Sequence, residues 1–230
     1  MKLSEFLIEK FTGRNDIKID DIPLSYFFKK CIQFGKGLVR GKIKGIGIKN
    51  KGKNLVIGKS VKIYGKKYLK LGNNIRINEF TRIDALSKDG IMLGDSVKIG
   101  AYSTIIGSGT IKKVGKGLSI GENSSFSEYT FFGAAGGIEI GKNVIGGQNI
   151  RFHAENHNYN DLTVPIKDQG VNHKGIILGN DIWIGSGVVF LDGAHVSDGS
   201  VIAANAVVTG SFPENCIIGG MPAKIIKQRG

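Results

Sequence analysis

The chain reads LGNDIWIGSGVVFLDGAHVSDGSVIAANAVVT from Leu178 to Thr209. Every sixth residue of this stretch is apolar: Leu178, Ile184, Phe190, Val196, Ile202 and Val208. The residues four positions after the first five of these are small or branched: Ile182, Val188, Ala194, Ser200 and Ala206. A period of six fits neither an amphipathic helix, which repeats every ~3.6 residues, nor an alternating strand, which repeats about every 2.

A chain that turns a corner every six residues explains this period. Each hexapeptide then forms one flat side of a prism, and three sides make a coil of roughly 18 residues. No coil can bury its apolar face alone, so stacked coils share one continuous core. The stretch therefore predicts an all-β fold, a parallel β-helix built from hexapeptide repeats.

The same spacing recurs earlier in the chain, with interruptions. It begins weakly near Leu55, and its phase slips at 64–70, 84–92 and 106–117, where we expect short loops leaving the corners. A longer break separates Ala154 from Ile177 before the repeat restarts. Long loops on a rigid scaffold usually carry function, so we expect the active site in this excursion, 154–177.

The repeat divides the chain into three parts. We expect the β-helix over 46–210, an N-terminal cap over 1–45, and a C-terminal tail over 211–230 that holds a strand or short helix. The cap carries helix signals at 4–11 and at 23–39, where Gly35 and Gly37 weaken the end of the second helix. A helix packed on the open end of the prism would cover its first coil.

Composition narrows the class of protein. Glycine accounts for 35 of 230 residues, which suits a fold with many corners. Two cysteines, Cys31 and Cys216, form no disulfide framework and indicate a reducing compartment, so we expect a cytoplasmic protein. The opening residues do not read as a signal peptide, and no apolar run approaches the roughly 18 residues of a membrane span.

The net charge of +13 is concentrated in one segment. Fifteen Lys or Arg and no Asp or Glu lie between Ile22 and Asn78, whereas the rest of the chain is close to neutral. Such a segment suits anionic lipid, a phosphate-bearing substrate or nucleic acid, although a solvated basic face explains it equally well. The basic helix at 23–39 is a candidate for peripheral contact with the inner face of a membrane. Binding of nucleic acid would lead us to expect interleaved aromatic residues, which are missing.

Histidines are the candidate catalytic groups. His153 follows a core residue and should face outward near the root of the long loop, and His157 lies within the loop. His173 also lies in the loop, whereas His195 occupies a side position of the repeat and reads as an exposed filler. A neutral imidazole can take a proton from a hydroxyl near pH 7. A zinc site needs a third converging ligand beside His153 and His157, and no Cys or paired carboxylate supplies it, so we expect no metal.

Two motifs resemble the hexapeptide-repeat acyltransferases. One is Ile182-Trp183-Ile184-Gly185-Ser186, and the other is the closing sequence from Gly219 to Ile226. The loop sequence Asn156-His157-Asn158-Tyr159, with Pro165-Ile166, Gln169-Gly170 and Lys174-Gly175-Ile176 after it, resembles the active-site loop of the sugar O-acetyltransferase branch. That branch includes maltose and galactoside acetyltransferases and enzymes that acetylate capsule or O-antigen sugars. The resemblance covers residues from about 55 to the end.

The resemblance implies a left-handed β-helix, a homotrimer with active sites between neighbouring prisms, and acetyl-CoA as cosubstrate. It implies His157 as the general base, and it carries cofactor contacts to Trp183, Ser186, Ala204, Thr209, Lys224 and Lys227. Relatives often place Lys directly after the Thr of that coil, where this chain has Gly210, so one phosphate contact is missing or supplied elsewhere. Further candidates for substrate binding are Asn149, His153, Glu155 and Lys174, and Glu155 could orient a histidine.

These features together predict an acetyl-CoA-dependent O-acetyltransferase that acts on a sugar hydroxyl, of a bacterial surface polysaccharide or its precursor. N-acetylation of an amino sugar nucleotide is the alternative within enzymes, because the same fold and base serve both reactions. A zinc hydratase and a non-catalytic β-helix scaffold are the alternatives from other classes.

Overall fold

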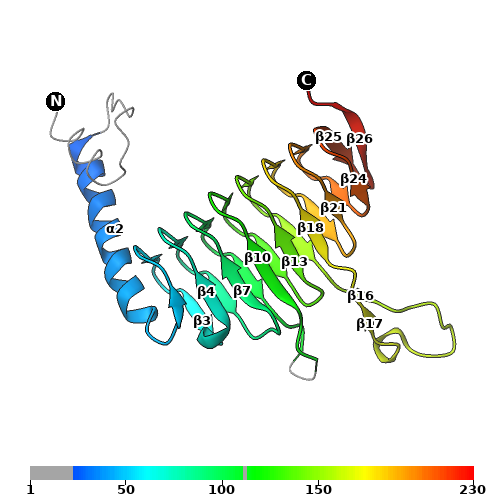
Figure 1. The fold of residues 1–230 in the computed structure, drawn as a ribbon, viewed down its shortest axis with the longest axis horizontal. Coiled ribbons are helices and arrows are strands. Elements are labelled where there is room, and N and C mark those ends of the chain that lie inside the picture. Colours follow the sequence, from blue (N-terminus) through cyan, green and yellow to red (C-terminus); the bar gives the residue numbers. More distant parts are fainter. Residues whose placement is uncertain (1–22, 111–112) are drawn as a thin grey trace.

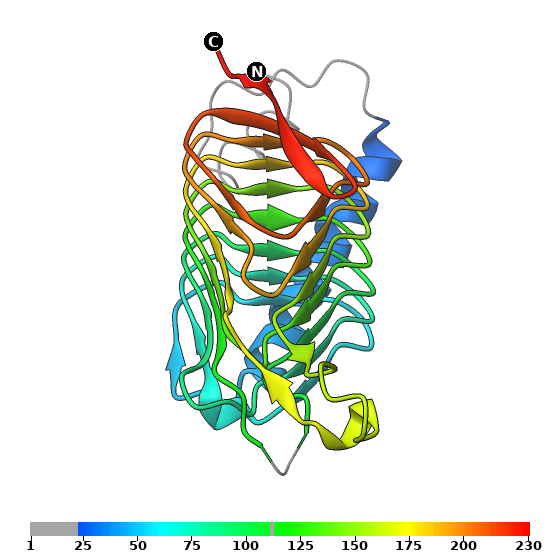
Figure 2. The same cartoon turned by 90° about the vertical axis from the view of Figure 1, so that its right-hand side faces the viewer.

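The computed structural model describes residues 23–110 and 113–230, and it forms a prism of stacked coils (Figures 1 and 2). The helix predicted at 4–11 lies outside the described residues. The prism has three parallel sheets, one for each side. Sheet A contains β1 (Asn50–Lys51), β4 (Leu69–Leu71), β7 (Gly90–Leu93), β10 (Gly117–Ile120), β13 (Ile138–Ile140), β18 (Ile176–Leu178), β21 (His195–Val196) and β24 (Ser211–Phe212).

The other two sides are built in the same way. Sheet B contains β2 (Val56–Ile57), β5 (Arg76–Ile77), β8 (Lys98–Ile99), β11 (Ser125–Phe126), β14 (Ile145–Gly146), β19 (Trp183–Ile184), β22 (Val201–Ile202), β25 (Cys216–Gly220) and the antiparallel β26 (Ala223–Gln228). Sheet C contains β3 (Lys62–Tyr64), β6 (Arg82–Asp84), β9 (Thr104–Ile106), β12 (Phe131–Gly133), β15 (Arg151–His153), β20 (Val189–Leu191) and β23 (Val207–Val208).

The six-residue columns form the core, as the sequence predicts. All six apolar residues that repeat from Leu178 are at most 2% exposed, and the column four positions later is buried as well. Strand register stacks residues one coil apart, so that Ile184 pairs with Ile202 and Phe190 with Val208. The rings of Phe152 and Phe190 stack with centroids 4.7 Å apart. The chain is therefore an all-β protein with a left-handed parallel β-helix as its body.

The corners explain the small residues in the repeat. A Cβ added at Gly185 would lie 2.5 Å from the backbone nitrogen of Ala204 in the next coil, so the close stacking of the coils requires glycine there. Asn205 turns the same corner one coil later with φ of 59°, a left-handed conformation that asparagine tolerates. The short loops predicted at the phase slips are present. They include η1 (Lys66–Tyr68) and the connection between β9 and β10.

Both ends of the prism differ from the sequence prediction. Helix α2 spans Leu24–Lys44 and does not stop at Val39. Gly35 is exposed, and a Cβ added there would have no neighbour within 4 Å, whereas Gly37 and Gly41 face the first coil. A Cβ at Gly37 would lie 2.6 Å from Cγ1 of Val56, and one at Gly41 would collide with the carbonyl oxygen of Leu55. These glycines therefore let the helix pack closely rather than end it. At the other end, β24 and β25 continue sheets A and B, so the coils extend to Gly220, beyond the predicted end at 210.

Candidate active site

The long excursion leaves the prism after β15 and returns at β18, at the corner between sheets C and A (Figure 1). It contains a small antiparallel pair, β16 (Asn156–His157) with β17 (Val171–Asn172), and a 3-10 turn, η2 (Ile166–Asp168). His157 pairs with Val171 and is exposed. The carboxamide of Asn158 links the two arms, since its Nδ2 donates to the Gln169 carbonyl at 3.0 Å and its Oδ1 accepts from Asn172 at 2.8 Å.

Gln169 organises the tip of this loop. Its Nε2 donates to the carbonyls of Asp161 and Val164, each at 2.7 Å, and its Oε1 accepts from the Asp161 backbone N–H at 3.1 Å. The Asp161 carboxylate in turn accepts from the Thr163 hydroxyl and backbone N–H, and these bonds lower the pKa of Asp161. The loop therefore holds its own shape and presents His157 on a defined hairpin.

The root of the loop carries a histidine–carboxylate pair that sequence reasoning did not assign. Nε2 of His173 lies 2.8 Å from Oε2 of Glu155, and both side chains are mostly buried. Glycines flank the pair, because a Cβ at Gly136 would lie 3.1 Å from Cβ of His173 and one at Gly109 would lie 3.5 Å from Oε1 of Glu155. Glu155 thus orients His173, whereas the sequence left open which histidine it would orient.

A buried carboxylate fixes the returning arm. Asp192 is 6% exposed and accepts hydrogen bonds from the backbone N–H groups of Lys174 at 2.9 Å and Gly175 at 2.8 Å. Sequence reasoning missed Asp192. A sequence pattern that could have identified Asp192 is an acidic residue directly after a core strand and directly before a glycine, Gly193. In the structure this glycine has φ of +88°. Lys174, which the sequence predicts as a substrate contact, is held here through its backbone N–H, which donates to Asp192.

His153 lies on β15, beside the loop root. Its ring centroid is 5.4 Å from that of Phe131 on the neighbouring strand. Partial burial lowers the pKa of His153, and the positive charge of Arg151 adds to this effect. Both causes favour the neutral imidazole at pH 7, which is the form that can accept a proton.

Three of the residues predicted to contact the cofactor, Ser186, Ala204 and Thr209, lie at the two edges of sheet C. Ser186 and Ala204 occupy the corner between sheets B and C, where Oγ of Ser186 accepts from the Gln148 backbone N–H at 3.2 Å. Asn149 turns the same corner one coil earlier, with φ of 56°. Thr209 lies at the opposite corner, between sheets C and A, the corner from which the loop leaves. A single chain therefore keeps Asn149, Ser186 and Ala204 apart from the loop histidines by the width of a sheet.

Trp183 and the C-terminal strand lie on sheet B. Trp183 is 60% exposed and lines a hollow of about 240 Å³ with Ile145, Val201 and Arg229. Lys224 and Lys227 are exposed on β26, opposite Gly219 and Ile217 of β25. The tail thus forms a strand and presents its basic side chains at the C-terminal end of the coils.

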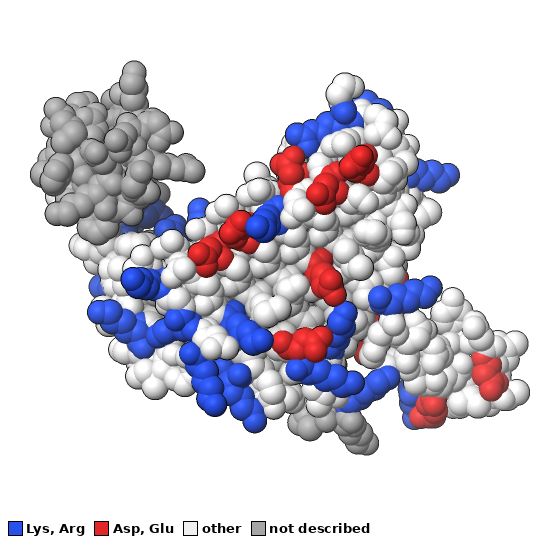
Figure 3. All heavy atoms as spheres, viewed as in Figure 1, with Lys and Arg blue, Asp and Glu red and all other residues white. Residues whose placement is uncertain are grey.

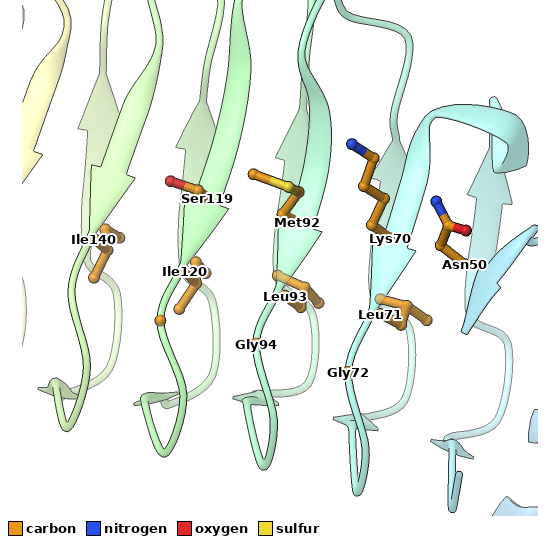
Figure 4. Close-up of a pocket in the computed structure, with 11 residues that line it drawn as sticks. Asn50, Lys70, Leu71, Gly72, Met92, Leu93, Gly94, Ser119, Ile120 and Ile140 are labelled. Atoms are coloured by element: carbon orange, nitrogen blue, oxygen red, sulfur yellow. The ribbon is translucent and has the colours of Figure 1, made fainter. Parts of the chain in front are cut away.

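A larger hollow, of about 440 Å³, lies on sheet A and contains none of the predicted site residues (Figure 4). One outward side chain from each coil projects beside it, and these side chains are Asn50, Lys70, Met92 and Ser119. In residues 23–110 and 113–230, no three His, Cys, Asp or Glu side chains come together as metal ligands. The same part of the chain holds no helix with the length and apolarity to cross a bilayer.

Comparison with known proteins identifies acetyltransferases. No protein-family model matches the chain. A probable acetyltransferase of Mycobacterium tuberculosis is 31% identical over 159 residues, which are 69% of this chain and 49% of that protein. The galactoside O-acetyltransferase of Escherichia coli is 28% identical over 48% of this chain and 63% of its own length. The chain thus spans about half to two thirds of these two relatives.

Two further matches cover more of the chain. The dTDP-4-amino-4,6-dideoxy-D-glucose acyltransferase of Escherichia coli is 26% identical over 81% of this chain and 85% of its own length. The crystal structure of AntD, an N-acyltransferase from Bacillus cereus in complex with dTDP and 3-hydroxybutyryl-CoA, aligns with a TM-score of 0.54 and 22% identity. This alignment covers 83% of this chain and 88% of that one. The structural match bears on the fold, which the two proteins share.

Proposed function

We propose that the chain is a hexapeptide-repeat acyltransferase and, on this premise, that it is an acetyl-CoA-dependent O-acetyltransferase acting on a sugar hydroxyl. One observation carries the proposal. An ordered hairpin holds an exposed imidazole, that of His157, at the corner of the prism where the loop leaves. The similarity to the galactoside O-acetyltransferase supports a sugar hydroxyl as the acceptor.

In the proposed mechanism, His157 is the general base. Its neutral imidazole takes the proton of the acceptor hydroxyl as the oxygen attacks the donor carbonyl, and it returns this proton to the departing sulfur. Such base catalysis contributes about 10²–10⁴-fold to the rate. Acetyl-CoA would supply the acetyl group as a thioester. Backbone N–H groups beside the hairpin would stabilise the oxyanion, and fixing both reactants in one crevice would supply much of the remaining acceleration.

The chemistry of the predicted cofactor residues fits coenzyme A. Trp183 offers an exposed apolar surface, and Ser186, Ala204 and Thr209 leave the corners uncrowded. Lys224 and Lys227 offer exposed positive charges that suit phosphate groups. Gly210 leaves its corner without the lysine that relatives often carry.

We propose that the active unit is a homotrimer. The loop histidines and the Ser186 corner lie on opposite edges of sheet C, so a second copy would bring the two sets together. An exposed ladder of aromatic rings follows the corner between sheets B and C, with Phe80, Tyr102 and Tyr129 stacked at 4.9 and 5.1 Å. Exposed apolar patches of this kind mark contacts between proteins. The ladder therefore supports association of copies along this edge.

We propose that the acceptor belongs to a bacterial surface polysaccharide or its precursor, and that the reaction takes place in the cytoplasm at the inner face of the membrane. The segment between Ile22 and Asn78 favours an anionic or phosphate-linked acceptor, because it carries fifteen basic residues and no acid. Both cysteines are free, which agrees with a reducing compartment.

N-acylation of an amino sugar nucleotide is the second candidate. It is favoured by the relative from Escherichia coli that this chain covers over 85% of its length. Incubation with radiolabelled acetyl-CoA and a panel of glycans and nucleotide sugars tests both reactions. If mild alkali removes the label from the sugar, the product is an ester, which supports O-acetylation. If the label survives, the product is an amide, which supports N-acylation instead. Failure to bind coenzyme A would indicate a non-catalytic scaffold.

A further inference from the structure

We propose that the outward face of α2 binds the surface of an anionic lipid bilayer. This inference deepens the membrane location proposed above by naming the surface that makes the contact, and its test does not depend on the transfer reaction. Helix α2 lies against the first coil at the N-terminal end of the prism (Figure 1). The helix therefore has one face on the protein and one face away from it.

The inner face is fixed to the prism by close packing and by polar contacts. Gly37 and Gly41 contact Val56 and Leu55, as described above. Nη1 of Arg40 donates to the Ile57 carbonyl at 3.0 Å, and Nζ of Lys44 donates to the Val61 carbonyl. These contacts determine the rotation of the helix about its axis, so the residues on its outer face are determined as well.

The outer face carries an apolar stripe. Phe28, Ile32, Val39 and Ile43 follow one another at spacings of four, seven and four residues, which places them on one side of a helix. Their side chains are 49%, 56%, 58% and 62% exposed, and Ile46, just after the helix, is 71% exposed. Soluble proteins seldom leave such a row uncovered, so the stripe indicates a binding surface.

Basic residues border the stripe and identify its partner. Lys29, Lys36 and Lys42 are exposed beside it, and α2 has no acidic residue. Lys and Arg side chains gather at the end of the molecule nearest α2 (Figure 3). An apolar stripe bordered by lysines is the pattern of helices that lie in the plane of a membrane interface. Anionic headgroups complement the lysines, while the acyl chains accept the apolar stripe. A second copy of this chain would bring its own lysines to the contact, and like charges would then oppose one another.

Co-sedimentation of the full chain with phosphatidylcholine vesicles, with and without phosphatidylglycerol, tests the proposal. We expect binding to the anionic vesicles that weakens with salt. The variant I32E/V39E/I43E should bind at least about tenfold more weakly, with an unchanged thermal midpoint because the three side chains are exposed. The matched control is Ile177→Glu on sheet A, an isoleucine that is 44% exposed and should leave vesicle binding intact. The variant K29A/K36A/K42A should lose the preference for phosphatidylglycerol.

Fluorescence separates insertion from adhesion. The chain has one tryptophan, Trp183, which lies on sheet B away from α2. In vesicles of lipid brominated on the acyl chain, Phe28→Trp should add emission that is quenched, while the wild-type emission is not. Failure of the wild-type chain to bind anionic vesicles, or equal binding by I32E/V39E/I43E, would overturn the proposal. A wild-type chain that stays off the vesicles but dissociates into smaller species on the triple substitution would show that a second copy covers the stripe.

Discussion

Glu155 and His173 join the two arms of the long loop at its root, with Oε2 of the carboxylate 2.8 Å from Nε2 of the imidazole. Both residues lie where the loop meets the prism, whereas His157 lies further out on the hairpin. The pair therefore sets the direction in which the hairpin leaves the coils. The pair positions His157, the proposed base, indirectly. In the described part of the chain, neither Glu155 nor His173 forms a hydrogen bond with the His157 side chain.

Glu155→Gln tests this positioning role. The amide can still accept a hydrogen bond but loses the charge, so we expect the hairpin to loosen and acetyl transfer to fall roughly tenfold to hundredfold. Hydrogen exchange over 156–172 should become faster in the variant. The matched control is Glu139→Gln, an exposed carboxylate on β13 paired with Lys116, which should leave transfer unchanged. If hydrogen exchange over 156–172 and acetyl transfer were both unchanged in Glu155→Gln, Glu155 would have no positioning role.

Among the substitutions considered, replacement of the proposed base should lower turnover the most. His157→Ala should lower turnover about a hundredfold or more, because the acceptor hydroxyl loses its proton acceptor. The affinity for coenzyme A and the oligomeric state should not change, since His157 is exposed on the hairpin. His195→Ala, on sheet A, is the control. Near-normal turnover in the first variant would reassign the base, and His153 would be the next candidate.

The stability of the fold should depend on pH through His153. Its pKa is lowered in the folded protein by partial burial and by Arg151, so the unfolded chain binds more protons between the folded pKa and the ordinary value of 6.5. Stability is therefore greatest above this window and falls as the pH drops through it. The thermal midpoint measured between pH 7.5 and 5.5 should fall less in His153→Gln than in the wild type. Identical pH profiles would contradict the assignment.

Asp192→Asn tests the anchor of the returning arm. The substitution leaves a weaker acceptor for two backbone N–H groups in a site that is 6% exposed, and we expect a loss of ~1–3 kcal/mol in the free energy of unfolding. Amide exchange of Lys174 and Gly175 should rise most. Asp198→Asn removes an exposed carboxylate that accepts from Asn180 and should cost less. An equal loss from both variants would argue against a special role for Asp192.

The repeat predicted the body of the fold because six-residue spacing is a local property of the chain. Each column residue from Leu178 to Val208 is buried where the period places it. The ends were harder to predict. Gly37 reads as a weak point of the helix, yet it and Gly41 allow close packing against Val56 and Leu55 of the first coil. Cys216 and Ile218 continue the core beyond the last regular hexapeptide.

The site was predicted only in part, because its geometry depends on contacts across the loop. The motif around His157 identified the loop, and the structure places that histidine on an ordered hairpin. Glu155 and His173 are 18 residues apart in sequence, and so are Asp192 and Lys174, so no local pattern could pair them. The division of the cofactor residues between two corners likewise follows from the winding of the coils.

Helix α2 also has a consequence for assembly. The first coil ends in backbone edges that match the edges at any other level of the prism, so an uncovered end could accept another molecule and begin a filament. Packing α2 against β2 through Gly37 and Gly41 covers the sheet B part of that end. The helix thereby prevents end-to-end association of β-helices. Deletion of α2 should convert oligomers of defined size into fibres.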